Sequence, residues 1–233
     1  MASRSGQGPG PREPSIEGAT IPGTSRHERA TAEFGRVANL SDGVFAIAMT
    51  LLVLTLDAPR VGTSGLAAAL IEQSPQLVAF VLAFALVANL WWQHHKLVAL
   101  FDFLEPGIIG INLVLLGAVA LVPFPTSLVG NAPTDRAAVL AFIAVFSVLS
   151  LLFLLLVVRA RQVGAWREGV SEQHVHWMLG QWGSGIVVLL SAALVAVWLP
   201  AVGLTVLALT MILGPIAARR GTVANRVARR VGA

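Results

Sequence analysis

The sequence predicts an all-α protein embedded in a membrane, with six transmembrane helices and with both termini in the cytoplasm. The chain of 233 residues is 56% hydrophobic and only 12% charged, which is too apolar for a water-soluble domain of ordinary composition. Six stretches are long and apolar enough to cross a bilayer. The lysine and arginine residues gather on one side of these stretches.

The six stretches are defined by their length. A helix that crosses the hydrocarbon core needs roughly 20 mainly apolar residues. The candidates are Val37–Leu56, Pro75–Trp92, Gly107–Leu128, Ala137–Val158, Leu179–Leu199 and Ala201–Ala218. We expect helix in each, because a chain in lipid must satisfy its backbone polar groups internally and because the alternating pattern of barrel strands is absent. The last two stretches are predicted to form a hairpin that turns at Pro200.

The basic residues predict the orientation, since the cytoplasmic segments of membrane proteins are enriched in Lys and Arg. With the N-terminus inside, fourteen of the 16 basic residues lie on the cytoplasmic side, and only Arg60 and Arg136 lie outside. Adding or removing one span would destroy this asymmetry. The number of spans and the orientation therefore support each other.

Three segments follow from the composition. Residues 1–35 are rich in Gly, Pro, Ser and charge and lack the apolar core of a cleaved signal sequence, so we expect a disordered cytoplasmic tail. Residues 36–218 form the six-helix transmembrane domain. Residues 219–233 form a basic cytoplasmic tail, which either lies on anionic lipid or is simply a stop-transfer flank.

Several classes of function are disfavoured. The charges occupy tails and loops rather than a groove, so no nucleic acid partner is expected. The chain has no Cys, and no HExxH, Walker A, GxSxG or GxGxxG pattern occurs in a plausible context. Asp42 is the one candidate acid–base group deep in a span, and it lacks an evident nucleophile or metal partner. Neither an enzymatic activity nor a cofactor is expected.

Polar residues within the spans gather at one depth. A charge at a helix centre costs about 2.5–3.5 kcal/mol in a bilayer, so each such residue requires a partner. The polar residues at the cytoplasmic ends of the first three spans are Arg36, Asn39, Ser41, Asp42, Gln93, His94, His95 and Asn112. We predict a network that fixes the first helix against its neighbours, with Asp42 paired to Arg36 or to a histidine. Separate solvation of each group at the membrane interface is the alternative.

The histidines do not predict a metal site. His94 and His95 lie about 100° apart around a helix, which suits two different partners better than one shared metal. His174 and His176 fall in a loop and are expected to be loop or interface residues.

The first span carries a stripe of residues at spacings of three and four. These residues are Gly43, Ile47, Thr50, Leu51 and Leu54, and they share one face of a helix. Such a stripe alone is typical of any helix contact within a membrane.

Four motifs carry a family resemblance. The segment RVANLSDGVFAIAMTLLVL, Arg36 to Leu54, closely resembles the first-helix signature of the transmembrane protein 175 family, RxxxFSDG followed by an apolar helix, with Leu40 in place of the usual Phe. This family comprises endolysosomal potassium channels and their prokaryotic relatives. The resemblance continues through WWQHHKL, Asn112 and PFPT, so it covers roughly residues 36–126.

The resemblance implies a potassium channel. A chain with one six-helix unit is similar to half of the animal proteins, which implies a homotetramer and a prokaryotic plasma membrane. The four first helices would then line a central pore. The hydrophobic constriction would map onto Ile47, with Leu51 and Leu54 as further rings and Thr50 as a layer of hydroxyl groups. Potassium ions would pass when the dewetted ring widens enough to admit water.

Other functions remain open on sequence alone. The chain has no TVGYG filter and no helix with repeated arginines, so potassium selectivity is expected to arise differently and voltage sensing is not expected. A secondary transporter of a small solute or ion is the main alternative, although related halves and broken midplane helices are not evident. A membrane scaffold without transport is a third interpretation.

Overall fold

The computed structural model describes residues 27–28, 32–59 and 65–206. Five helical segments in these ranges are long and apolar enough to cross a membrane: Ala32–Thr55, Ser74–Ala99, Pro106–Asn131, Arg136–Val163 and Glu172–Trp198. The chain is therefore a mostly helical, multi-pass membrane protein. The first segment contains α1 (Ala32–Leu51) and the 3₁₀ helix η1 (Leu52–Thr55), and the second is α3. The third contains α4 (Pro106–Leu121) and α5 (Pro123–Asn131), and the last two are α6 and α7.

The sixth predicted span, Ala201–Ala218, lies mostly outside the described residues, as do the tail 219–233 and most of residues 1–35. Residues 200–206 are helical and return along α7. Gly203 comes so close to α7 that a Cβ on it would lie 2.6 Å from the Cβ of Ala196. The chain thus reverses at Leu199 and Pro200, where the proline cannot continue the preceding helix.

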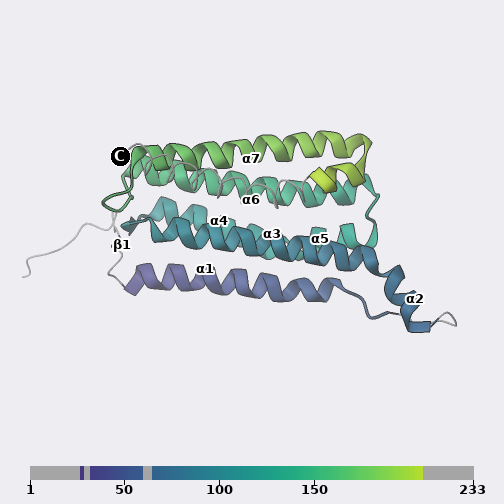
Figure 1. The fold of residues 1–233 in the computed structure, drawn as a ribbon. Helices are drawn as coiled ribbons and strands as arrows, with labels where there is room; N and C mark the ends of the chain where they lie inside the picture. The colour runs from purple at the N-terminus through teal and green to yellow at the C-terminus, as the bar shows by residue number, and fades with distance from the viewer. Residues whose placement is uncertain (1–26, 29–31, 60–64, 207–233) are drawn as a thin grey trace, which may run out of the picture.

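The long helices lie side by side in one bundle, with α1 at one edge and α7 at the opposite edge (Figure 1). Helix α6 packs against α4, α5 and α7, whereas α1 packs against α3 and α4. The stretch Ala137–Val158 is apolar on all sides because one face of α6 packs on neighbouring helices and the other is uncovered. Phe142, Phe146 and Phe153 are fully buried, whereas Val148, Leu151 and Leu155 are exposed. Phe153 stacks on Trp182 of α7 with ring centroids 4.3 Å apart.

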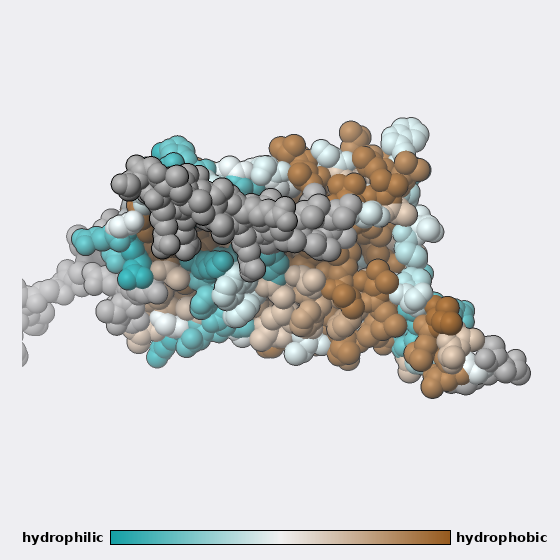
Figure 2. Space-filling model, in the orientation of Figure 1, coloured by the Kyte–Doolittle hydropathy of each residue, from teal (hydrophilic) through white to brown (hydrophobic). Residues whose placement is uncertain are grey.

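The bundle has two distinct ends. We call proximal the end that holds the start of α1 and the end of α3, and distal the end that holds η1 and the short helix α2 (Gly65–Glu72). Hydrophobic side chains dominate the distal half in Figure 2, and hydrophilic ones gather toward the proximal end. The 26 residues of α3 extend for about 39 Å, longer than a hydrocarbon core of about 30 Å. Its polar proximal turns therefore reach the membrane interface.

Short backbone pairings join the proximal connections. Strand β1 (His27–Glu28) pairs antiparallel with β2 (Phe103–Leu104) in the loop between α3 and α4. The same loop bonds to the α6–α7 loop, through Asp102 N to Ala165 O at 2.8 Å and Arg167 N to Leu100 O at 3.0 Å. Two-residue strands have no detectable sequence period, so the hydropathy pattern could not predict them.

An ion pair fixes the start of α4 to α6. Arg159 Nε donates to Glu105 Oε1 at 2.6 Å, and this bond lowers the pKa of the Glu105 carboxyl from its ordinary value. Gly107 leaves room for the pair, because a Cβ there would lie 2.5 Å from Glu105 Oε1 and 2.8 Å from Arg159 Nε.

The spans differ in detail from the sequence prediction. The fifth begins at Glu172 rather than near Leu179, so the prediction of a loop at His174 and His176 is wrong and both lie on α7. The second continues to Ala99 rather than ending near Trp92. The first begins at Ala32 rather than near Val37, and its last turn is the 3₁₀ helix η1 rather than α-helix.

The third span is broken at Val122, where Pro123 and Pro125 remove backbone donors. The missing donors are those for Val119 O and Leu121 O. Val122 N donates to Val119 O at 3.1 Å instead, and the amide and the hydroxyl of Thr126 both donate to Val122 O, at 3.3 and 2.8 Å.

Candidate functional site

Three buried polar side chains from three helices form a chain of hydrogen bonds at the proximal end. We call them the buried triad: Ser41 on α1, His94 on α3 and Asn112 on α4. Asn112 Nδ2 donates to Ser41 Oγ at 3.0 Å, and His94 Nε2 lies 2.8 Å from Asn112 Oδ1. The three residues are at most 5% exposed. The network predicted from their common depth thus contains these three residues.

The direction of each bond in the buried triad follows from the first one. The hydroxyl of Ser41 donates to Val37 O at 2.9 Å, so its oxygen must accept from Asn112. Asn112 therefore presents its amide nitrogen to Ser41 and its carbonyl oxygen to His94. It follows that His94 donates through Nε2. The imidazole is enclosed by Phe45 of α1 and Phe153 of α6, at centroid distances of 5.4 and 6.1 Å.

Asp42 has a different partner from the one predicted. Trp91 Nε1 of α3 donates to Asp42 Oδ1 at 2.9 Å. Arg36 is exposed and forms no hydrogen bond or ion pair with another residue that the structure describes. Six residues along one helix place Arg36 about 120° around from Asp42, which explains why the two do not meet. Trp91 could have been suspected as the partner, because it precedes the histidine pair at the same depth.

His95 lies apart from the buried triad. It is exposed and stacks on Trp92, with centroids 6.3 Å apart and an interplanar angle of 16°. Lys96 Nζ lies 4.8 Å from the centroid of the same indole. The two adjacent histidines therefore have different surroundings, as their angular separation indicated. No group of three His, Asp or Glu side chains able to hold a metal occurs within the described ranges.

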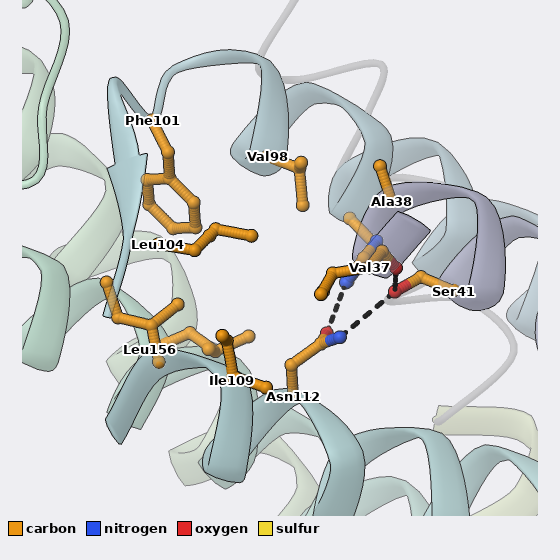
Figure 3. A pocket seen from close by; sticks show the side chains of 11 residues that line it. Val37, Ala38, Ser41, Val98, Phe101, Leu104, Ile109, Asn112 and Leu156 are labelled. Atoms are coloured by element: carbon orange, nitrogen blue, oxygen red, sulfur yellow. Dashed lines mark hydrogen bonds between the residues drawn. The ribbon is translucent and has the colours of Figure 1, made fainter. Parts of the chain in front are cut away.

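A small cavity of about 10 Å³ adjoins the buried triad (Figure 3). Eleven residues from α1, α3, α4, α6 and the α3–α4 loop line it: Val37, Ala38, Ser41, His94, Val98, Phe101, Leu104, Ile108, Ile109, Asn112 and Leu156. The space is about that of one water molecule, yet most of the lining is apolar and the polar side chains bond to one another. The triad therefore sits against apolar packing rather than in a hydrated channel.

The opposite face of α1 carries the predicted stripe and is uncovered in the single chain. Ile47 is 59% exposed and Leu54 74% exposed, whereas Phe45 and Leu52 are fully buried against the bundle. Leu51 and Thr50 are also exposed. Leu54 lies on η1 rather than on α1. The structure thus separates one anchored face of α1 from one apolar, unpacked face.

The hydroxyl of Thr50 has a defined direction. Its Oγ1 donates to Ile47 O of the preceding turn at 2.8 Å. The proton is therefore used within the helix, and the lone pairs of the oxygen remain on the exposed side. An oxygen of this kind can accept a hydrogen bond from water or contact a cation.

The sequence of this chain is similar to those of known proteins. A family model described as endosomal/lysosomal potassium channel TMEM175 matches residues 36–123, a region that contains the first three motifs and ends at the first residue of PFPT. A protein named as a potassium channel from Chamaesiphon minutus is 36% identical over 128 residues, which are 52% of this chain and 63% of that relative. A Bos taurus relative, named endosomal/lysosomal proton channel TMEM175, is 37% identical over 97 residues, which are 38% of this chain and 20% of its length.

The structural likeness extends beyond the motifs. The crystal structure of a lysosomal potassium-selective channel TMEM175 homolog from Chamaesiphon minutus superposes with a TM-score of 0.71 at 30% sequence identity. The match covers 78% of this chain and 98% of that chain. The helices after Thr126 therefore share this arrangement, although the sequence motifs end there.

Two buried serines allow a test of the triad. Ser41 and Ser150 both donate to the carbonyl four residues earlier, but Ser41 alone also accepts from another helix. We expect Ser41→Ala to lower the free energy of unfolding by about 1–3 kcal/mol more than Ser150→Ala, because it leaves Asn112 Nδ2 buried without an acceptor. Unfolding in mixed detergent micelles, followed by tryptophan fluorescence, measures the difference. Equal losses would show that the bond between helices does not stabilise the fold.

Proposed function

This chain belongs to the family of the endosomal/lysosomal potassium channel TMEM175, and on that premise we propose that it is a potassium-permeable channel. Four copies assemble around a central axis, and the α1 helices line the pore. Conduction is passive. The relatives named as potassium channels and the potassium-selective homolog of known structure support this proposal.

The exposed stripe of α1 is the observation that carries the proposal. Helix α1 lies at the edge of the bundle and has Ser41 and Phe45 turned inward, toward α3 and α4. The stripe residues are left without packing partners in one chain. A fourfold arrangement with α1 innermost brings equivalent stripes together around one axis, whereas an arrangement with α1 outward leaves them in lipid.

The stripe residues have distinct roles in this pore. Ile47 forms the main hydrophobic constriction, and Leu51 and Leu54 form further rings. Such rings close a pore by dewetting and conduct when they widen enough for water to enter. Thr50 lies between them, and its oxygen has lone pairs directed away from the helix because its proton bonds to Ile47 O. Four such oxygens replace part of the hydration shell of a passing cation.

The proximal end faces the cytoplasm in this proposal, and the chain crosses the membrane six times. Fourteen of the 16 basic residues then lie inside, as the positive-inside rule requires. The membrane is the cell membrane of a prokaryote, since the single-unit relatives are bacterial proteins.

A secondary transporter is the second candidate, and the break between α4 and α5 is the feature that favours it, because transporters bind substrates at discontinuous helices. The channel is preferred because Val122 N donates to Val119 O, the carbonyl that Pro123 deprives of its donor, and Thr126 donates to Val122 O, so that neither carbonyl is left free to bind a solute. Proton conduction is the third candidate, because the bovine relative is named a proton channel.

Ion flux in liposomes separates these functions. Purified protein is reconstituted in vesicles with a potassium gradient, and flux is recorded with potassium, sodium or protons as the permeant ion. We expect a passive flux that is larger for potassium than for sodium and that does not saturate in the manner of a carrier. A saturable uptake coupled to protons would contradict the channel and support the transporter. A flux of protons alone would support the proton channel.

Two substitutions on α1 test the assignment of the pore face. Ile47→Asn is expected to raise potassium conductance, because a polar ring at the constriction holds water. Phe45→Asn, two residues away, places an amide in the fully buried core and is expected to reduce the yield of folded protein instead. Single-channel recording and size-exclusion chromatography measure the two effects. Similar behaviour of both variants would contradict the assignment.

A further inference from the structure

The backbone just beyond η1 is held by side chains at the start of α3. Asp57 N donates to Gln76 Oε1 at 3.3 Å, and Gln73 Nε2 donates to Asp57 O at 2.6 Å. Both backbone polar groups of one residue are thus bonded by two glutamines, the N-cap residue of α3 and a residue in its first turn. Figure 1 shows the chain leaving α1 past the distal end of α3 on its way to α2.

Gln76 also bonds to α5. Its Nε2 donates to Asn131 Oδ1 at 2.7 Å and lies 3.4 Å from Asp57 Oδ2. The orientation of this amide is determined by its partners, because the nitrogen faces two oxygens and the oxygen faces a backbone N–H. Asn131 is itself held by Ser127, whose carbonyl accepts from Asn131 Nδ2 at 3.0 Å. We call Asp57, Gln73, Gln76 and Asn131 the distal bracket.

Close packing supports the same contact independently of the hydrogen bonds. A Cβ at Gly130 would lie 3.2 Å from the Cα of Gln76, so α5 approaches α3 at this point more closely than most residues allow. Leu52, at the start of η1, is fully buried, and η1 packs against both α3 and α5. The hydroxyl of Thr55 bonds to Leu52 O at 2.7 Å and closes the last turn.

We propose that Gln76 is a positioning residue for the distal part of the pore. This inference rests on the proposed function. Leu54, the outermost ring residue, lies three residues before Asp57, and the distal bracket fixes the chain directly after it. The distance of Leu54 from the pore axis is therefore set by the bonds of Gln76 to Asp57 and Asn131. Because the bracket residues are exposed or half-buried, their loss changes the position of η1 more than it destabilises the fold.

The variant Gln76→Leu tests this role, with Gln93→Leu as the matched control. Gln93 is on the same helix and also forms a side-chain amide bond, to Gln181 at 3.2 Å, but at the proximal end. We expect Gln76→Leu to lower the permeability ratio of potassium to sodium by about threefold or more, since a less constrained ring discriminates less between ions. Gln93→Leu is expected to keep the wild-type ratio. Bi-ionic reversal potentials in planar bilayers give these ratios.

A second pair of variants keeps the test decisive if Gln76→Leu fails to assemble. Asn131→Asp retains the acceptor for Gln76 Nε2, whereas Asn131→Leu removes it. The added charge of Asn131→Asp attracts both monovalent cations alike, so it affects conductance rather than the permeability ratio. We expect Asn131→Asp to keep the ratio and Asn131→Leu to lower it.

The outcomes are distinguishable from a failure of the proposed function. A wild-type protein without potassium flux overturns both the channel and the positioning role. If the wild-type protein conducts but Gln76→Leu keeps the wild-type permeability ratio of potassium to sodium, the positioning role alone is overturned. Where Gln76→Leu does not assemble, an unchanged ratio in Asn131→Leu has the same consequence. A lowered ratio in Gln93→Leu as well would show a general effect of amide removal and would also overturn it.

Discussion

The hydrogen bonds from Ser41 through Asn112 to His94 are the constraint on which the orientation of α1 depends. All three side chains are buried, and a buried polar group without its partner is costly. Rotating α1 by one residue, or about 100°, would carry Ser41 away from Asn112 and leave two polar groups unpaired among apolar side chains. The triad therefore fixes which face of α1 is turned outward from the bundle.

The outward face of α1 is exposed because of the position of α1 in the bundle. Helix α6 packs against three neighbours, α4, α5 and α7, whereas α1 is at the edge and contacts the rest of the chain on one side. The buried triad holds its proximal half and the distal bracket holds the segment after η1. The stripe between these two anchors is held in place without being packed within the chain, as the proposed contact between copies of the chain requires.

The sequence predicted the level of the polar residues and the face of the stripe, because both follow from helical periodicity and from hydropathy. It did not predict the individual bonds. Asp42 bonds to Trp91 rather than to Arg36, since partners between helices depend on how the helices are rotated against each other. The 3₁₀ turn that carries Leu54 and the bonds of Gln76 were also missed. Both depend on contacts between segments far apart in the chain, which one sequence does not reveal.

The central claim is that the stripe of α1 faces a water-filled pore, and thiol accessibility tests it most directly. The chain has no cysteine, so a single introduced thiol is the only target of a water-soluble methanethiosulfonate reagent. Our account predicts that Leu54→Cys is modified and that its potassium current is then blocked. Leu190→Cys, which is exposed on α7 at the opposite edge of the bundle from α1, is predicted to keep its current. Block of Leu190→Cys together with an unaffected Leu54→Cys would contradict the account.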